Sequence, residues 1–134
     1  MEKYNRFTPD NITELKGNEI FVFGSNLAGL HRGGAARAAN LYFGAEWGVG
    51  VGFTGHCYAI PTMHGGVKDI KPYVDMFVND AKKHTDKVFL VTALGCGIAG
   101  FKPSEIAPLF KECLALENVY LPKSFVEVLE KNYF

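Results

Sequence analysis

The fold is decided by residues 19–36, which read EIFVFGSNLAGLHRGGAA. Glu19–Phe23 is a continuous run of apolar, β-branched and aromatic residues, and this pattern is typical of a strand buried on both faces. Residues 24–26 end that strand. The alanine-rich segment Gly33–Phe43 predicts a helix, and Gly44 is placed to terminate it. A buried strand that leads through a glycine-rich turn into a helix indicates an α/β protein.

The rest of the chain alternates between the same two kinds of element. We expect a short helix from Thr8-Pro9-Asp10 to about Leu15, strands at Cys57–Ile60, Lys87–Thr92 and Val119–Leu121, and helices from Asp69 or Lys71 to His84, over Pro103–Leu116, and from Pro122 or Lys123 to Leu129. Residues 44–56 carry five glycines and predict a loop with one short edge strand. This order predicts one domain over residues 1–134, an α/β/α sandwich of three layers around a mixed, mostly parallel sheet.

Composition limits the kinds of partner. The chain has 134 residues, of which 48% are apolar, so a packed core is expected and disorder is not. No apolar run approaches the roughly eighteen residues that suggest a membrane span, and no membrane partner is expected. Fourteen basic and fourteen acidic residues give a net charge of zero, which disfavours non-specific binding to nucleic acid. A nucleotide ligand stays possible, because backbone N–H groups can hold phosphates without net positive charge.

The cysteines and the first residues point to a cytoplasmic protein. Cys57, Cys96 and Cys113 are odd in number and lack paired spacing, so we interpret them as reduced thiols. Residues 1–6 have no apolar stretch behind their charges and do not resemble a secretory signal.

The first candidate binding loop follows the buried strand at residues 24–36. Gly33 and Gly34 lie where the helix starts, so their N–H groups lack intrahelical acceptors and can approach a phosphate or a ribose. Asn26 offers an amide and Ser25 a hydroxyl at the end of the strand. The alternative is a wide turn that needs glycine for its backbone angles, with Asn26 capping a local group.

The second candidate loop is Leu94–Pro103, which contains G-x-G-x-x-G between a strand and a helix. It is a poor dinucleotide fingerprint, because that motif follows the first strand of its sheet and needs an acidic residue about twenty positions on, at the end of the next strand. Glu117 precedes the next strand instead. No Gly-Lys-Ser/Thr follows, which excludes a Walker loop. A loop that wraps a phosphate is the natural interpretation.

These residues resemble the macro domain family, which binds ADP-ribose and related metabolites. Thr92–Phe101 looks like that family's diphosphate-holding loop, and Asn26 with residues 31–35 is similar to its first loop, where an asparagine holds the distal ribose. Asp10–Leu15 resembles the Gly-Asp-Ile-Thr segment that contacts adenine. The element order agrees over nearly the whole chain. The resemblance implies that the ligand is bound by Asp10, Asn11, Ser25, Asn26, Gly33, Gly34, Ala35, Gly95, Cys96, Gly97, Ile98, Ala99, Gly100 and Phe101.

The departures from the family pattern concern chemistry more than fold. Asn11 stands where the family usually has its adenine-reading aspartate, and His31-Arg32 replaces half of the glycine run. Ala36 stands where hydrolytic members of one branch carry an aspartate, and Ala99 replaces an aromatic residue that covers the distal ribose. The resemblance therefore supports a ligand class better than a reaction.

Three hypotheses follow. In the first, the protein binds ADP-ribose or a related adenine nucleotide, or an ADP-ribosylated macromolecule, and hydrolyses an ADP-ribosyl bond, with Asn26 and His31 as catalytic candidates and no metal or cofactor. In the second, it is a reader of such a nucleotide without catalysis. In the third, the glycines serve packing alone. A catalytic Cys96 is a weaker idea, because no histidine is placed to pair with it. The oligomeric state is left open.

Overall fold

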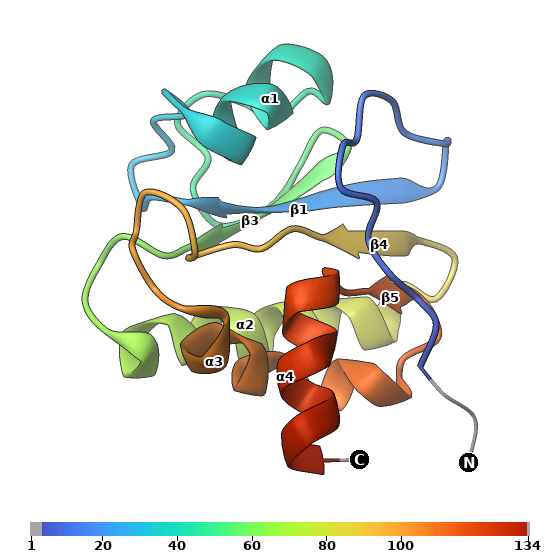
Figure 1. Cartoon of the computed structure of the whole chain (residues 1–134). Helices are drawn as coiled ribbons and strands as arrows, with labels where there is room; N and C mark the ends of the chain where they lie inside the picture. The colour runs from blue at the N-terminus through green and yellow to red at the C-terminus, as the bar shows by residue number, and fades with distance from the viewer. Residues whose placement is uncertain (1–3, 134) are drawn as a thin grey trace.

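The computed structural model describes residues 4–133. Its elements, in chain order, are β1 (Glu19–Ser25), α1 (Gly34–Tyr42), β2 (Gly52–Thr54), β3 (Cys57–Pro61), α2 (Val67–Lys83), β4 (Val88–Val91), α3 (Pro103–Ile106), a 3₁₀ helix (Ala107–Ala115), β5 (Val119–Tyr120) and α4 (Lys123–Tyr133) (Figure 1). The strands and helices expected between residue 19 and the end of α4 are therefore present, with shifted ends.

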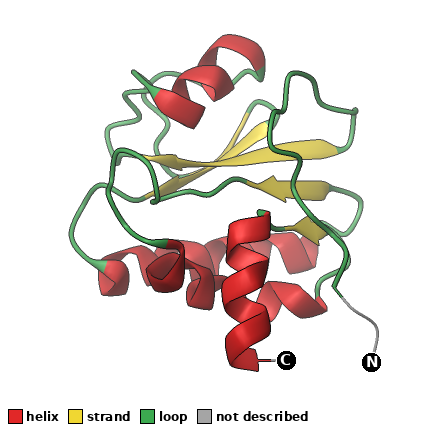
Figure 2. Ribbon diagram, viewed as in Figure 1, coloured by secondary structure: helices red, strands yellow, loops and turns green. Residues whose placement is uncertain are grey.

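The five strands form one sheet in the order β2-β3-β1-β4-β5. Figure 2 shows the strands in yellow, with helices above and below them in the view. β1 is central and pairs in parallel with β3 on one side and β4 on the other. β5 is parallel to β4, and only β2 at the far edge is antiparallel to its neighbour. The chain is thus an α/β protein with a mixed, mostly parallel sheet.

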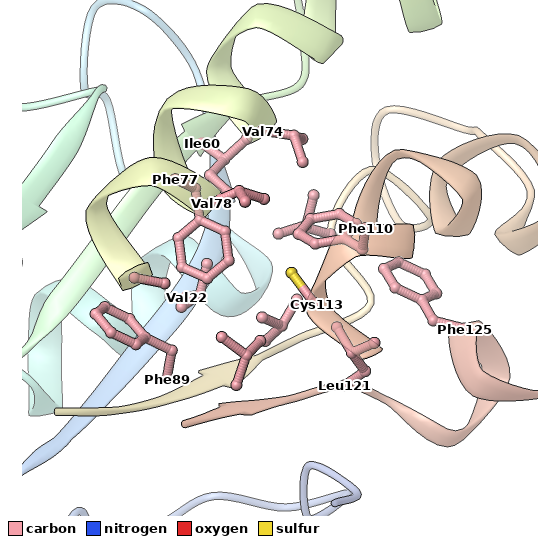
Figure 3. Close-up of a cluster of buried hydrophobic side chains, with 14 of the residues drawn as sticks. Val22, Ile60, Val74, Phe77, Val78, Phe89, Phe110, Cys113, Leu121 and Phe125 are labelled. Atoms are coloured by element: carbon pink, nitrogen blue, oxygen red, sulfur yellow. The ribbon is translucent and has the colours of Figure 1, made fainter. Parts of the chain in front are cut away.

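Side chains of β1 alternate between two apolar clusters. Phe21 and Phe23 lie in the smaller cluster, which α1 covers on one face of the sheet. Val22 lies in the larger cluster on the opposite face, which α2, α3, the 3₁₀ helix and α4 cover (Figure 1). Figure 3 shows the middle of the larger cluster, which includes Val22, Ile60, Val74, Phe77, Val78, Phe89, Phe110, Cys113, Leu121 and Phe125. Because both faces of β1 are buried, its apolar run is continuous.

The expected helix from Thr8 to Leu15 is wrong. Phe7 instead forms a parallel bridge with Leu121, beside the sheet. Thr8 donates its N–H to the Leu121 carbonyl at 2.9 Å and its hydroxyl to the Val91 carbonyl at 2.7 Å. Thr-Pro-Asp is a common helix start in which the threonine hydroxyl caps the helix, but here the Thr8 hydroxyl holds the segment against β4, a partner that local sequence cannot reveal.

Two helix boundaries also differ from expectation. The predicted helix Pro103–Leu116 is a short α-helix followed by the 3₁₀ helix, and Pro108 lies where the change occurs. Proline has no N–H to donate to the fourth residue before it, so the α-helical ladder is interrupted there. α2 begins at Val67, before the expected start, because the Asp69 carboxylate accepts a hydrogen bond from the N–H of Gly66 at 2.8 Å.

No helix within residues 4–133 combines the length and the apolar composition needed to cross a membrane.

The larger cluster allows a direct test of the packing. Phe77 is fully buried, and its ring meets those of Tyr58, Phe89 and Phe110. We expect Phe77→Ala to lower the free energy of unfolding by about 3–5 kcal/mol in urea titration, because it leaves a cavity among aromatic rings. Met76→Ala on the same helix is the control, since Met76 is 38% exposed. Equal effects of the two substitutions would contradict the packing described.

Candidate functional site

A cavity of about 490 Å³ opens at the carboxyl ends of β1 and β4. Both candidate loops border it, and Figure 1 shows them leaving the same end of the sheet, at the left of the view. The lining residues are Gly24, Ser25, Asn26, Leu30, Arg32, Gly33, Gly34, Ala35, Ala36, Thr62, Met63, Thr92, Ala93, Leu94, Gly95, Gly97, Ile98 and Ala99.

The cavity follows from the sheet order. β1 and β4 are neighbours, yet the chain leaves β1 for α1 on one face and leaves β4 for α3 on the other. The two loops therefore diverge and leave a crevice between them. Open α/β sheets bind their ligands at such a switch point.

The first loop is held in shape by its own polar groups. The Asn26 side chain accepts a hydrogen bond from the Leu30 N–H at 2.9 Å and donates one to the Leu30 carbonyl at 3.0 Å. The Ser25 hydroxyl donates to the Gly50 carbonyl at 2.5 Å and is buried. Local bonding of Asn26, weighed above as the alternative to ligand binding, is therefore present. The amide still has one N–H and one lone pair for a ligand.

Two glycines let the first loop lie against the segment that follows α1. A Cβ on Gly50 would lie 2.0 Å from the Asn26 carbonyl oxygen, and one on Gly29, at φ 69°, would meet the Gly48 backbone. Gly48 also donates its N–H to the Gly29 carbonyl at 2.9 Å. Part of the glycine content of residues 44–56 thus allows close approach of two backbones rather than ligand binding.

The loop after β3 forms the third wall of the cavity. Thr62 donates its N–H to the Ser25 carbonyl, which extends the pairing of β3 with β1. Farther out, the N–H of Leu27 donates to Nε2 of His64 at 2.8 Å. These bonds join the third wall to the first loop.

The second loop leaves a row of backbone donors free. Its turns are closed by Cys96 N–H to the Ala93 carbonyl and by Phe101 N–H to the Gly95 carbonyl. The N–H groups of Gly97, Ile98 and Ala99 donate no hydrogen bond to any described residue. Free N–H groups at the start of α1, where the first turn has no intrahelical acceptors, border the same cavity.

Ile98 bridges the two loops. Its side chain is 78% exposed, and its Cδ1 lies 3.6 Å from the position that a Cβ on Gly33 would take. Met63 on the third wall is exposed as well. The rim of the cavity is therefore apolar, while its inner surface offers backbone donors.

Charge at the cavity is one-sided. Arg32 is the only charged residue among those that line it, and no carboxylate side chain does. The lining therefore suits an anionic ligand.

Most of the predicted binding residues meet at this cavity. Ser25, Asn26, Gly33, Gly34, Ala35, Gly95, Gly97, Ile98 and Ala99 line it, whereas Asp10, Asn11, His31, Cys96, Gly100 and Phe101 do not. Phe101 and Cys96 pack against the larger apolar cluster, and Gly100 closes a turn by donating its N–H to the Gly97 carbonyl.

His31 lies beneath the first loop. It is 2% exposed, and its Nε2 donates to the Glu46 carbonyl at 2.9 Å. Its ring stands edge-on to those of Phe23 and Trp47. Nδ1 is buried and has no hydrogen-bond partner among the described residues. In this position the imidazole anchors the loop to the 44–50 segment rather than facing the cavity.

Asp10 and Asn11 lie outside the cavity, in the exposed segment after Thr8. Asp10 follows Thr8 by two residues, and the Thr8 hydroxyl is bonded to the carbonyl of Val91, the residue before the lining residue Thr92. Asn11 borders a second hollow beside Glu19 and Leu90, at the amino end of β1. A role of these two residues in binding a base stays a prediction.

Arg32, Thr62, Met63 and Thr92 line the cavity without having been named as binding residues. Arg32 lay inside a predicted loop, and Thr92 at the end of a predicted strand, so sequence signals existed for both. Thr62 and Met63 could be found only by knowing that β3 lies beside β1.

Within residues 4–133, no three His, Cys, Asp or Glu side chains lie together in a way that could hold a metal ion. Comparisons of the chain with protein-family models, with curated proteins and with solved structures gave no match.

The contact between the first loop and Gly50 can be tested by a single methyl group. We expect Gly50→Ala to lower the free energy of unfolding by about 2–3 kcal/mol, because the new Cβ overlaps the Asn26 carbonyl. Gly17→Ala is the matched control, since no atom lies within 4 Å of the added carbon; we expect a change within about 0.5 kcal/mol. A neutral Gly50→Ala in urea unfolding would mean that the loops do not touch as described.

Thiol reactivity tests whether Cys96 is an activated nucleophile. Burial raises the pKa of Cys57 and of Cys113 to about 12, and burial followed by the nearby Glu105 carboxylate raises the pKa of Cys96. A raised pKa leaves less thiolate near neutral pH. We expect Cys96 to react with Ellman's reagent at pH 8 more slowly than free cysteine, and Cys57 and Cys113 to react only after unfolding in urea. If Cys96 reacts faster than free cysteine, the hypothesis that Cys96 is a catalytic nucleophile is supported again.

Proposed function

We propose that the protein binds ADP-ribose or a closely related adenine nucleotide in the cavity between β1 and β4. The diphosphate lies against the N–H groups of Gly97, Ile98 and Ala99 and against the start of α1, and the distal ribose lies beside Asn26. The observation that carries the proposal is the row of free N–H groups on a loop that faces a helix start across one cavity. Donors of both kinds hold phosphate without net positive charge.

The size and polarity of the cavity support this ligand class. About 490 Å³ lies within the range of small-molecule sites, which bury most of a ligand between apolar walls and a few fixed donors. The apolar rim formed by Met63 and Ile98 suits the flat or apolar faces of a sugar or base.

Binding without hydrolysis is favoured over hydrolysis. No carboxylate lines the cavity, and position 36 holds an alanine. The His31 imidazole is buried and bonded to Glu46, and the His64 imidazole accepts a hydrogen bond from the Leu27 N–H. A hydrolase needs a group that accepts a proton from the attacking water. In this site only the phosphates of the ligand itself remain for that purpose.

The likeness to macro domains belongs to the same proposal. The central β1, the neighbouring β4, and the helices on both faces of the sheet support a three-layer arrangement of that kind. Both loops border one cavity at the same end of the sheet, which supports the proposal.

Calorimetric titration with ADP-ribose, ADP, AMP and NAD tests the proposal, with Gly97 as the site of variation. A Cβ on Gly97 meets no atom within 4 Å, so Gly97→Ala and Gly97→Glu should both fold. We expect the affinity of Gly97→Ala for ADP-ribose to lie within about threefold of that of the parent protein. We expect the affinity of Gly97→Glu to fall by about 30-fold, because its carboxylate faces the diphosphate.

The outcomes separate the hypotheses. Equal binding by Gly97→Glu and the parent places the ligand elsewhere. No binding of any of the four nucleotides overturns the proposal and favours glycines that serve packing alone. Release of ADP-ribose from an ADP-ribosylated protein by the parent chain would establish hydrolysis in place of reading.

A further inference from the structure

The three arginines of the chain have different surroundings. The Arg6 guanidinium donates to the carbonyls of Val119 and Leu114 and lies 4.4 Å from the centre of the Tyr4 ring, so it serves the fold. Arg37 is exposed on α1 and does not line the cavity. Arg32 is exposed, lines the cavity, and makes no side-chain hydrogen bond or ion pair with any described residue. It is thus a cation at the cavity with no anionic partner among the described residues.

The backbone fixes where Arg32 lies. His31 is packed beneath the loop, and the Arg32 N–H donates to the Leu30 carbonyl at 3.0 Å. On the other side, Gly33 is the cap of α1. Arg32 is therefore held between a buried anchor and a helix start, and its charge adds to the free N–H groups there.

We propose that Arg32 is the residue that makes the cavity select anionic ligands, by pairing with a phosphate group that lies at the start of α1. This assignment rests on the proposed function and deepens it, since it states which side chain recognises the charge of the ligand. Because the whole chain has no net charge, this selectivity is local and does not come from the overall field of the protein. Arginine suits the task, since its planar fork can donate two parallel hydrogen bonds to a phosphate.

The test compares the parent protein with Arg32→Gln, Arg32→Lys and Arg37→Gln. Arg37→Gln changes the net charge by the same amount as Arg32→Gln, at a position five residues along in α1 that does not line the cavity. Each protein is titrated with ADP-ribose and, separately, with inorganic pyrophosphate, at 50 and 500 mM NaCl. Thermal unfolding is recorded for each, and we expect little change, because neither side chain has a hydrogen-bond or ion-pair partner within residues 4–133.

We expect Arg32→Gln to bind both probes about tenfold more weakly at 50 mM NaCl, and Arg37→Gln to bind within about twofold of the parent. Salt should weaken binding by the parent and by Arg32→Lys, and weaken it much less for Arg32→Gln, because the screened ion pair is absent there. A residue with a merely structural role would not change the salt dependence.

The two probes separate this inference from the proposed function. ADP-ribose binding that is equal in the parent and Arg32→Gln, or equally weakened in Arg37→Gln, overturns the role of Arg32 and leaves the nucleotide site standing. Pyrophosphate binding that needs Arg32, without binding of ADP-ribose, supports the role of Arg32 and overturns the nucleotide class. Failure of the parent to bind either probe overturns both.

Discussion

The central position of β1 is the constraint on which the rest of the structure depends. Its backbone pairs with β3 on one side and β4 on the other, and both of its faces are covered. The chain must leave such a strand over one face, and it leaves over the face opposite to the one that β4 uses. The cavity is the space between these two departures, so it results from strand order before any side chain is considered.

Polar side chains of the first loop hold the walls of that space in shape by bonding to backbone groups. Asn26 folds its own loop, Ser25 holds Gly50, and His31 is packed between Phe23 and Trp47. The polar residues that most resemble ligand-binding groups thus also keep the loop in place. Rigid loops that present free N–H groups can bind an anion without reorganising at the moment of binding.

Sequence alone predicted the central strands well, because Glu19–Phe23 and Lys87–Thr92 are apolar runs with little alternation. It predicted both loops that meet at the cavity, because strand ends on one edge of a parallel sheet are neighbours. It failed where a long-range partner decides the structure. Thr8 has the local pattern of a helix cap, yet its hydroxyl is bonded to Val91, 83 positions away. Thr62 and Met63 reach the cavity only because β3 pairs with β1, which no local pattern reveals.

The contacts of residues 4–8 with the last third of the chain bear on how the molecule is assembled. The Tyr4 hydroxyl donates to the carbonyl of Val119, 115 positions later, and Phe7 and Thr8 pair with Leu121. During synthesis these early residues must wait until β5 has left the ribosome. Closing so long a loop costs entropy that only the finished sheet can offset. The fold can therefore be completed only after Val119 and Leu121 are made. Residues 4–8, although made early, are among the last to reach their final contacts.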